Sequence, residues 1–483
     1  MTKHSINIHP LGVHKAMPQF LFPFSILKKE KQSLIKLLGK EGFQFYSLEN
    51  EDLENAFYGE GFHISHSTLD QYFLPYIEQM LFPQTTHDPG LLRFSKSMNH
   101  SCVLKTKHHD IPFSIHSVDI ILCPFDIGIM TIRTEVNKHE SSYSDVLDFM
   151  NHFRVLEPKL AEQKAADIVC CGETFKTVQK YIFSHLFPFI VPFVDRGEKQ
   201  STYFGSLPYF VDERMYTIGY IELDDKYEMD DVNLFRTGQL NSYDQEGHLF
   251  ISAHNMDYIQ NYVDTHVHKR WAPETYYTIS DHAFTCLTFS SSSKATAIGN
   301  EWFGQNYYNL LLHFFYKIVL LKLTYEYSTL NFEKDQDDVE KLIKSISVFS
   351  AKFLFSEISS RTEGQEFSQA FKEIFHINSL YEEVKGTLST LYQNQEKMAD
   401  KRNNYLLLIL TIYTVISGIY GMNLVIEDWK GKIDWAKLAN YSLFEYISLV
   451  VAVSGIILGI AMAIGAVFKL VKEFQKKRYG EEG

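Results

Sequence analysis

Six residues near the C-terminus could place small or polar side chains along one line of a helix, because they recur at spacings of three and four. They are Asp400, Asn403, Leu407, Thr411, Thr414 and Gly418. The sequence around them, from 405 to 420, is otherwise apolar and has no charged residue. Such a stripe is one way in which a helix can line a path for ions. The alternative is that the two threonines bond backbone carbonyls of their own helix.

Two other groups of residues have the chemistry of metal ligands. An acidic run could hold a divalent cation through carboxylate oxygens, and it consists of Glu222, Asp224, Asp225, Glu228, Asp230 and Asp231. Imidazoles and a thiol gather between 100 and 116, at His100, Cys102, His108, His109 and His116, together with Asp110. The spacing of this second group matches no zinc motif. In both cases solvated surface residues are the favoured interpretation.

The composition excludes several classes of protein. The 483-residue chain has 46 Lys and Arg against 59 Asp and Glu, whereas a general nucleic-acid binder leans the other way. We therefore expect no direct nucleic-acid partner. The phosphate-binding motif GxxxxGK[ST] and the hydrolase motifs GxSxG and HExxH do not occur, so no enzyme is predicted. Five cysteines at irregular spacing indicate a reducing compartment.

The pattern of apolar and polar residues changes along the chain. Its first part is dense in β-branched and aromatic residues between turn signals, which predicts a mixed α/β domain, and the pattern becomes helical from 301. A seam of apolar residues then predicts a stalk helix that continues without proline into an apolar segment. The predicted segments are a cytosolic α/β domain 1–300, a cytosolic helical region 301–377, a stalk helix 378–404, a first pore-lining transmembrane helix 405–423, an external loop 424–442, a second transmembrane helix 443–468 and a basic cytosolic tail 469–483.

The two apolar segments predict a transmembrane hairpin. The first just reaches the ~20 residues that cross the hydrocarbon of a bilayer, and the second has Glu445 as its single charge. Basic residues precede the first apolar segment, at Lys401 and Arg402, and follow the second, along 469–478. By the positive-inside rule both termini are cytoplasmic. We therefore expect a multi-pass protein of the inner or plasma membrane whose partner is the lipid bilayer.

The tripeptide Gly421, Met422 and Asn423 closes the first predicted span, follows a long stalk helix and precedes an acidic loop. In this context the segment 378–480 resembles the signature of the CorA-type magnesium transporters. The resemblance implies a pentameric funnel, with an α+β cytosolic domain, a helical stalk and a C-terminal two-helix transmembrane hairpin. It also implies a homopentamer with 421–423 at the pore mouth and passive flux of Mg²⁺ or a similar divalent cation.

The residues at this mouth suit a hydrated cation. Magnesium gives up its water reluctantly, and a ring of Asn423 amide oxygens could accept hydrogen bonds from that water. Glu427, Asp428 and Asp434 in the predicted external loop would concentrate cations outside. A solvated loop is an equal alternative for these three carboxylates.

Two departures from the family leave a second function open. The proline usual in mid-span and the Met-Pro-Glu sequence of the outer loop are missing. The cytosolic part is also larger than the family norm, which is similar to the CorA-like proteins encoded beside type III CRISPR systems. That branch implies a membrane effector of antiviral defence, opened by a nucleotide-type second messenger bound to the cytosolic domain.

Overall fold

The structure is a computed structural model of the 483 residues. It describes residues 6–137, 141–158, 166–195, 214–225, 227–289, 294–330, 335–423 and 442–447, and short pieces from 449 to 460. Within the final helix, side chains are described up to Val415 and at Gly418. The chain forms two compact units, Met1–Leu388 and Ser389–Gly483.

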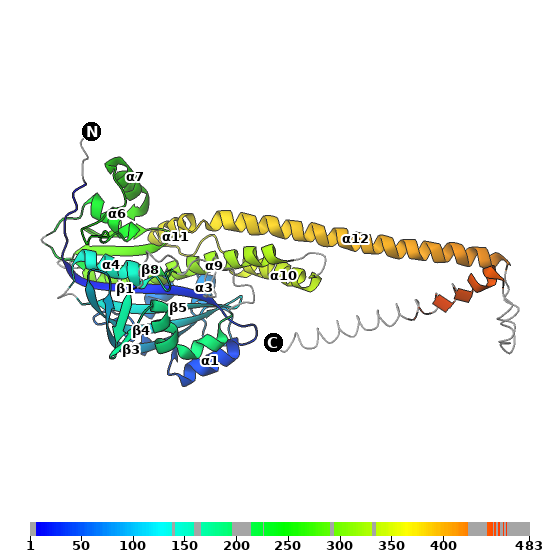
Figure 1. The fold of residues 1–483 in the computed structure, drawn as a ribbon, viewed down its shortest axis with the longest axis horizontal. Helices are drawn as coiled ribbons and strands as arrows, with labels where there is room; N and C mark the ends of the chain where they lie inside the picture. The colour runs from blue at the N-terminus through cyan, green and yellow to red at the C-terminus, as the bar shows by residue number, and fades with distance from the viewer. Residues whose placement is uncertain are drawn as a thin grey trace. The chain divides into compact units, whose positions relative to one another are not determined.

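One large sheet organises the first unit (Figure 1). Among the described residues, eleven strands pair in the order β7-β6-β3-β4-β5-β1-β8-β11-β10-β9, with β2 beside β3. Neighbours are antiparallel except β8 and β11, which are parallel. The strands are β1 Val13–Ser25, β2 Gln44–Phe45, β3 Leu92–Lys105, β4 Asp110–Cys123, β5 Ile127–Val136, β6 Asp167–Cys170, β7 Glu173–Phe175, β8 Tyr216–Leu223, β9 Val267–His268, β10 Tyr276–Ile279 and β11 Ala283–Phe289.

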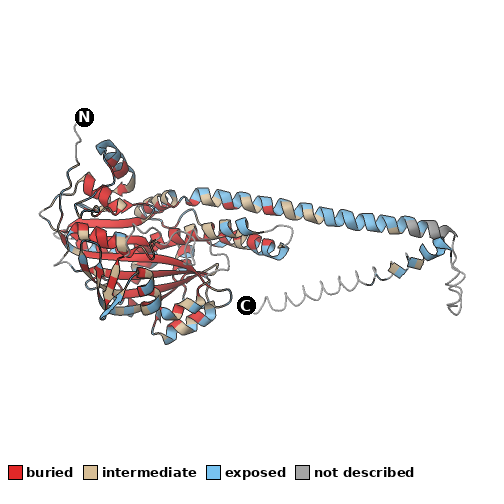
Figure 2. Ribbon diagram, viewed as in Figure 1, coloured by how far each residue is buried: buried red, intermediate tan, exposed pale blue. Residues whose placement is uncertain are grey.

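The central strands are buried on both faces (Figure 2). This double burial explains why β1 is a nearly continuous apolar run and does not alternate. Phe20 and Phe22 point to one face, where Phe20 packs against Phe149 with ring centroids 5.8 Å apart. The helices on that face are α1 Lys31–Lys40, α4 Tyr143–Phe153, α5 Val178–Lys180, the π-helix η2 Tyr181–Leu186, η3 Pro188–Phe193, α6 Asp231–Gln239 and α7 Met256–His266.

A second layer of helices covers the opposite face. Trp302 packs on Phe284 of β11 with ring centroids 4.2 Å apart, and Phe314 packs on Tyr216 of β8 with ring centroids 5.7 Å apart. The apolar segment 306–327 is interrupted by His313, Lys317 and Lys322, which favours a buried helix over a membrane span. In the structure this segment lies in α9 of the second layer and is largely buried, which confirms that preference. The elements of this layer are η1 Glu51–Glu54, α2 His66–Tyr72, α3 Pro75–Leu81, α8 Ala295–Glu301, the π-helix η4 Trp302–Asn306, α9 Tyr307–Thr329, α10 Gln336–Lys352 and α11 Thr362–Ile374.

A buried ionic cluster joins the sheet to this second layer. Asp119 Oδ2 lies 3.0 Å from Arg93 Nε and 2.7 Å from an Arg133 terminal nitrogen, and all three side chains are buried. Burial alone would raise the pKa of Asp119, but the two guanidinium groups lower it below its usual value. Arg93 also donates to the hydroxyls of Tyr58 and Tyr308. The cluster therefore fixes the register of β3, β4 and β5 beneath α9.

The membrane part of the predicted fold is wrong for the residues that the structure describes. Helix α12, Ile377–Asn423, holds both the stalk segment and the apolar segment after it. Nowhere in the described chain does a helix combine the length and the apolarity needed to cross a bilayer.

The same finding corrects the predictions that depended on the hairpin. The C-terminal transmembrane hairpin of the pentameric funnel, the channel and the multi-pass location in an inner or plasma membrane are contradicted. The predicted external loop 424–442 lies outside the described residues except for Ser442, and the predicted second span is described only in short pieces. One of these pieces contains Ser454, whose Oγ accepts a hydrogen bond from the Tyr413 hydroxyl of α12 at 2.9 Å.

Candidate metal centre

The edge of the sheet brings two cysteines and a histidine onto one face. In the antiparallel ladder of β3 and β6, Cys102 lies directly opposite Cys170. Residues directly opposite in such a ladder share a face, and side chains two apart on a strand do too. His100, Cys102 and Cys170 therefore point to the same side of the sheet. That side is the one on which the π-helix η2 packs.

Helix η2 supplies the remaining side chains of the site. Tyr181 and His185 are four residues apart, and both are directed towards β3 and β6. Their rings stack with centroids 5.7 Å apart, and Phe175 of β7 packs against His185 at 5.1 Å. This aromatic packing orients the His185 imidazole before any ligand is bound.

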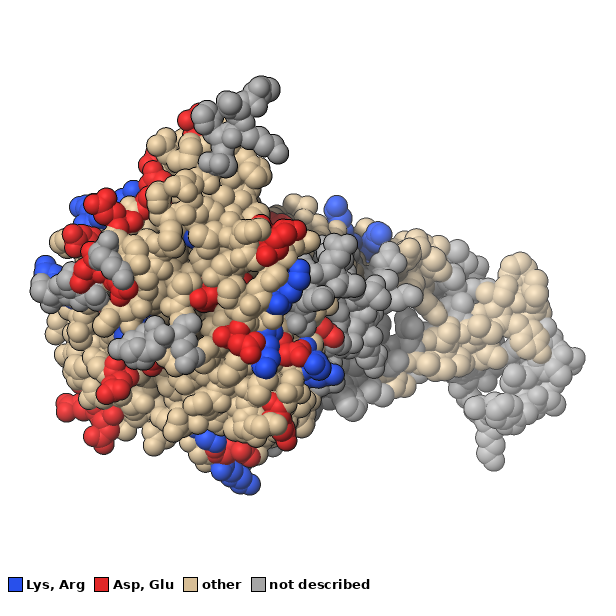
Figure 3. Space-filling view, turned by 60° about the vertical axis from the view of Figure 1, so that its left-hand side comes forward, with Lys and Arg blue, Asp and Glu red and all other residues tan. Residues whose placement is uncertain are grey.

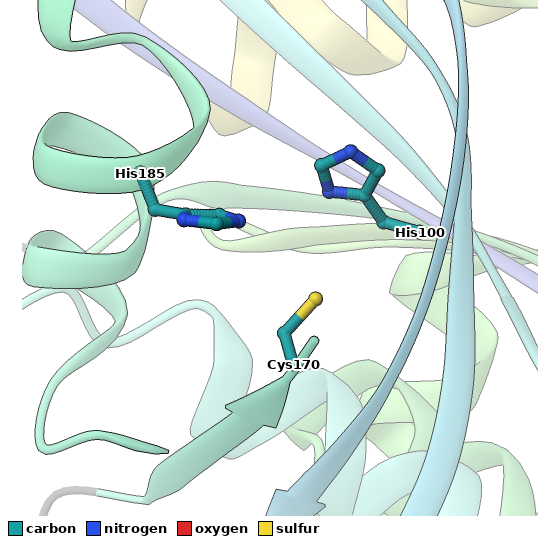
Figure 4. Close-up of side chains that lie close together, drawn as sticks. All are labelled: His100, Cys170 and His185. Atoms are coloured by element: carbon teal, nitrogen blue, oxygen red, sulfur yellow. The ribbon is translucent and has the colours of Figure 1, made fainter. Parts of the chain in front are cut away.

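Three potential ligand atoms converge between these elements (Figure 4). One ring nitrogen of His100, one of His185 and the Cys170 sulfur all lie within 4.8 Å of one another. Within the described part of the chain, these residues form the one group of three His, Cys, Asp or Glu side chains with such a geometry. A tetrahedral ion with bonds of about 2.0–2.3 Å needs ligand atoms roughly 3.4–3.7 Å apart. Rotamer movements of roughly an ångström would close the site.

The electrostatics of His100 suit a metal ligand. Burial, then His185 and Lys96, lowers the pKa of His100, so the ring is neutral near pH 7 and has a free lone pair. Among the described residues, His100 Nδ1 is buried and has no hydrogen-bond partner. A buried polar atom without a partner costs about 1–3 kcal/mol. A metal ion bound at this nitrogen would remove that cost.

Two further thiols flank Cys170. Tyr181 donates its hydroxyl proton to Cys170 Sγ at 3.6 Å, and the same hydroxyl lies 3.2 Å from Cys102 Sγ. Burial raises the pKa of the Cys102 thiol, so this group stays neutral. Cys171 is exposed and its Sγ lies 3.6 Å from Cys170 Sγ, a contact that raises the pKa of Cys171.

A cavity of about 860 Å³ opens on the other face of the same strands. Ser101 and Val103, which alternate with His100 and Cys102 along β3, are part of its lining. Cys171 also lines the cavity, from the hairpin turn between β6 and β7. Through its contact with Cys170, the Cys171 side chain connects the cavity to the candidate metal centre.

The ligand set selects a class of metal. Two imidazole nitrogens and one thiolate suit Zn²⁺ and other late d-block ions, whereas Mg²⁺ demands oxygen ligands in an octahedron. Three protein ligands leave a fourth position of a tetrahedral ion open. The Tyr181 hydroxyl beside Cys170 is a neighbour of the kind that tunes a metal ligand through a hydrogen bond.

Known proteins offer no relative that bears on this site. Comparison of the chain with protein families, with curated proteins and with solved structures finds no match. The CorA resemblance therefore rests on the sequence of 378–480 alone, and the type III CRISPR branch gains no support.

The predicted pore-lining stripe lies on α12. Thr411 and Thr414 donate their hydroxyl protons to the carbonyls of Leu407 and Leu410, at 2.7 and 2.8 Å. These bonds correspond to the alternative that the sequence left open, since the hydroxyls are used within their own helix. Asp400, Asn403 and Leu407 are exposed, and a Cβ on Gly418 would meet nothing within 4 Å.

The side chains of the predicted pore mouth and of the predicted external carboxylates lie outside the described residues. Gly421, Met422 and Asn423 form the end of α12, and their side chains are outside the described residues. Glu427, Asp428 and Asp434 fall wholly outside them. Their roles stay predictions.

The acidic run is used for local structure. Asp230 accepts a hydrogen bond from the Asn233 backbone N–H at 2.7 Å and so caps α6, and Asp231 lies 3.8 Å from Lys269 Nζ. The backbone N–H of Asp224 donates to the carbonyl of Gly12, and Asp225 is exposed. In the described residues these carboxylates do not form a metal-binding group.

Sequence reasoning favoured a solvated surface position for His100 and did not consider Cys170 or His185 as ligands. His100 was among the histidines between 100 and 116, but its partners come from 170 and 185. The adjacent Cys170 and Cys171 are visible in the sequence, and a helical pattern after them would have placed His185 one turn from Tyr181. The pairing of β6 with β3, which joins the two halves, is not encoded in any local spacing.

Proposed function

We propose that this protein binds a divalent d-block cation, Zn²⁺ by ligand chemistry, through His100, Cys170 and His185. The convergence of three ligand atoms within 4.8 Å supports the proposal most directly. Within the described residues, His100 Nδ1 is buried and has no hydrogen-bond partner, so it is free to serve as a ligand.

The bound ion would act as a clamp between three elements that are distant in the sequence. Its ligands come from β3, β6 and η2, so binding would fasten η2 onto the edge of the sheet. Metal binding of this kind adds its free energy to the folded state. A metal-responsive, non-enzymatic protein fits this arrangement, in keeping with the lack of enzyme motifs in the sequence.

The cation class predicted from the sequence is retained in this proposal, but the metal and the process change. Nitrogen and sulfur ligands replace the oxygen environment that magnesium prefers. Transport is not carried forward, since no described helix crosses a membrane. The homopentamer implied by the resemblance stays a prediction.

The cavity does not favour the predicted nucleotide ligand. Its lining includes the carboxylates of Glu60, Glu135 and Glu222 against the single lysine Lys15. Such a lining repels a polyanion. Figure 3 likewise shows acidic and basic side chains intermixed on the visible face, without a basic stripe.

The test is a zinc titration of the full chain after removal of metal with a chelator. A chromophoric zinc indicator measures the stoichiometry, and Co²⁺ substituted for Zn²⁺ reports a thiolate ligand through its charge-transfer absorption. We expect one equivalent to bind, with the cobalt–thiolate band present, and an excess of Mg²⁺ not to compete. His185→Ala and Cys170→Ser should both lose binding.

Two variants serve as matched controls. Cys102→Ser removes a thiol on the same face that is not one of the three ligands, and His87→Ala removes an exposed imidazole. Both should bind zinc as the wild type does. Equal zinc affinity in His185→Ala and the wild type, or no binding by the wild type, would overturn the proposal.

A further inference from the structure

The floor of the cavity of about 860 Å³ consists of polar side chains from five neighbouring strands of the sheet. Ser101 of β3 lies opposite Ser114 of β4, and Ser114 lies opposite Glu135 of β5. On the next two strands, Lys15 of β1 lies opposite Glu222 of β8. Residues that are directly opposite in a ladder point to the same face of the sheet. The carboxylates of β5 and β8 therefore lie on one surface, with β1 between them.

An aromatic ring forms a second wall of the cavity. Phe62 packs edge-on against Phe303 and Tyr220, with ring centroids 4.8 and 5.6 Å apart. A Cβ at Gly299 of α8 would lie 2.1 Å from the Phe62 ring, so this ring is in close contact with α8. The packing fixes the ring in place beside the polar floor. Glu60, two residues earlier, adds a further carboxylate to the lining.

Glu222 is a buried carboxylate without a counter-charge. It is 8% exposed, and its Oε1 accepts a hydrogen bond from the Tyr220 hydroxyl at 2.9 Å. That hydroxyl also lies 2.9 Å from the Ala295 carbonyl, so the two acceptors share one proton. Within the described part of the chain, no basic side chain forms an ion pair with Glu222. A buried charge is costly unless an opposite charge accompanies it, so the cavity offers a cation a favourable position.

The ammonium group of Lys15 shows which chemistry this cavity accepts. Although Lys15 lies opposite Glu222 in the ladder, its Nζ donates to the Glu60 carbonyl at 3.0 Å. The same nitrogen lies 4.3 Å from the centroid of the Phe62 ring, in a cation–π contact. A carbonyl and an aromatic face together therefore bind one ammonium group and leave the Glu222 carboxylate free for another.

The charges and dimensions of the cavity select a class of ligand. Glu60, Glu135 and Glu222 outnumber the single lysine Lys15, so the lining attracts cations. Glu135 and Glu222 lie on strands two positions apart, which corresponds to roughly 10 Å between their backbones. A linear molecule with an ammonium group at each end fits this separation. The cavity volume of about 860 Å³ is within the range of sites for small molecules.

We propose that this cavity binds a linear aliphatic polyamine, with one ammonium group at Glu222 and another at Glu135. The methylene groups between them lie beside the Phe62 ring, and the Ser114 hydroxyl accepts a hydrogen bond from the ammonium group near Glu135. This site is on the opposite face of the sheet from His100, Cys170 and His185. It therefore does not rest on the proposed zinc binding.

The experiment is isothermal titration calorimetry of the full chain with spermidine, after removal of metal with a chelator. We expect one equivalent to bind, with an affinity that falls as the NaCl concentration rises. Succinate, which carries two negative charges, should not bind. Binding of succinate as tight as that of spermidine, or displacement of spermidine by an equal concentration of Mg²⁺, would overturn the proposal.

Four variants locate the bound polyamine. Glu222→Gln keeps the shape of the side chain and should weaken binding about 10- to 100-fold, because it removes a charged acceptor. Glu135→Gln should weaken binding less, since Glu135 is only half-buried. Lys15→Met should strengthen binding about two- to fivefold, because it removes a like charge and uncovers the Phe62 ring. Glu246→Gln changes an exposed carboxylate outside the cavity and should bind as the wild type does.

The variants also distinguish a specific site from general attraction to an acidic protein. The chain has a formal net charge of -13, so a polycation could bind weakly at many surface positions. Several weak equivalents that Glu222→Gln leaves unchanged would overturn the proposal, and so would the absence of binding by the wild type. Because Lys15→Met and Glu222→Gln change the affinity in opposite directions, a loss of folding in one variant cannot reproduce the expected pattern.

Discussion

Tyr181 donates its hydroxyl proton to Cys170 Sγ over 3.6 Å, and the donor comes from η2 while the acceptor comes from the edge of the sheet. This bond orients the Cys170 sulfur, which is one of the three candidate metal ligands. Neighbours of this kind typically change metal affinity by 10- to 100-fold. Tyr181→Phe should therefore weaken zinc binding about tenfold without changing the stoichiometry, as measured by competition with a chromophoric chelator.

The control for this prediction is Phe175→Leu, which alters the packing against His185 but removes no hydrogen bond. We expect a smaller effect on affinity there than in Tyr181→Phe. An unchanged affinity in Tyr181→Phe would mean that the hydroxyl serves Cys102 and not the metal ligand.

The second prediction concerns the buried cluster around Asp119. Asp119→Asn leaves Arg93 and Arg133 buried without their counter-charge, and both are 3% exposed or less. Removing one partner of a buried ion pair costs about 3–5 kcal/mol. We expect the free energy of unfolding, measured by chemical denaturation, to fall by that amount.

Asp110→Asn is the matched control, because Asp110 lies 3.4 Å from Lys105 at an exposed position. An exposed pair of this kind is worth about 0–1 kcal/mol. Similar losses in the two variants would show that the buried cluster is not a special contributor to stability.

The third prediction concerns pH. His313 is fully buried between the Asn309 carbonyl at 2.8 Å and Ser368 Oγ at 3.0 Å, and burial lowers its pKa to about 3. Because the folded pKa lies below the unfolded value of about 6.5, stability is complete above pH 6.5 and is lost as the pH falls from 6.5 towards 3. At pH 5 the loss from this residue is about 2 kcal/mol.

The measurement is the free energy of unfolding from pH 7.5 to 5 in the wild type and in His313→Gln. The variant should be less stable at pH 7.5, and the gap should shrink by about 2 kcal/mol at pH 5. The exposed His87→Gln should keep the wild-type slope. Parallel curves for His313→Gln and the wild type would contradict the prediction.

The fourth prediction compares two glycines. A Cβ at Gly128 of β5 would lie 2.3–2.8 Å from ring atoms of Phe24, whereas a Cβ at Gly39 of α1 would meet nothing within 4 Å. Gly128→Ala should cost about 1–3 kcal/mol through overpacking. Gly39→Ala should stabilise by about 0.5–1 kcal/mol, because alanine favours the helix. Thermal unfolding of both variants checks the opposite signs.

Local sequence signals predicted several elements of the first unit. The density of Val, Ile and Phe on both sides of Pro124 predicts two strands in 116–136. They are β4 and β5, which pair around the turn at Pro124–Asp126. The helical spacing of apolar residues in 141–158 predicts a helix, with Ser144 as a candidate N-cap. This helix is α4, but its N-cap is Ser142, because Asp145 completes a capping box with Ser142. Dense β-branched residues and capping patterns act over a few positions, so they can be identified without the fold.

Long-range pairing could not be predicted. The sequence of β1 does not predict that this strand lies between β5 and β8 in the sheet. The sequence around His100 does not predict that Cys170 and His185 lie close to it. The apolar segment after Lys401 was interpreted from its composition and its Gly-Met-Asn terminus. Composition does not distinguish threonines that face ions from threonines that bond Leu407 and Leu410, and in the structure they make the second kind of bond.

The central place of β1 has a consequence for synthesis on the ribosome. β1 can pair with β5 as soon as the first 136 residues have emerged, but its other edge waits for β8, which begins at Tyr216. At 5–20 residues per second, that apolar edge stays unpaired for roughly 4–16 s. An open strand edge of this kind invites pairing with other chains. The growing polypeptide therefore passes through an interval in which an apolar strand at the centre of the final sheet is still an open edge.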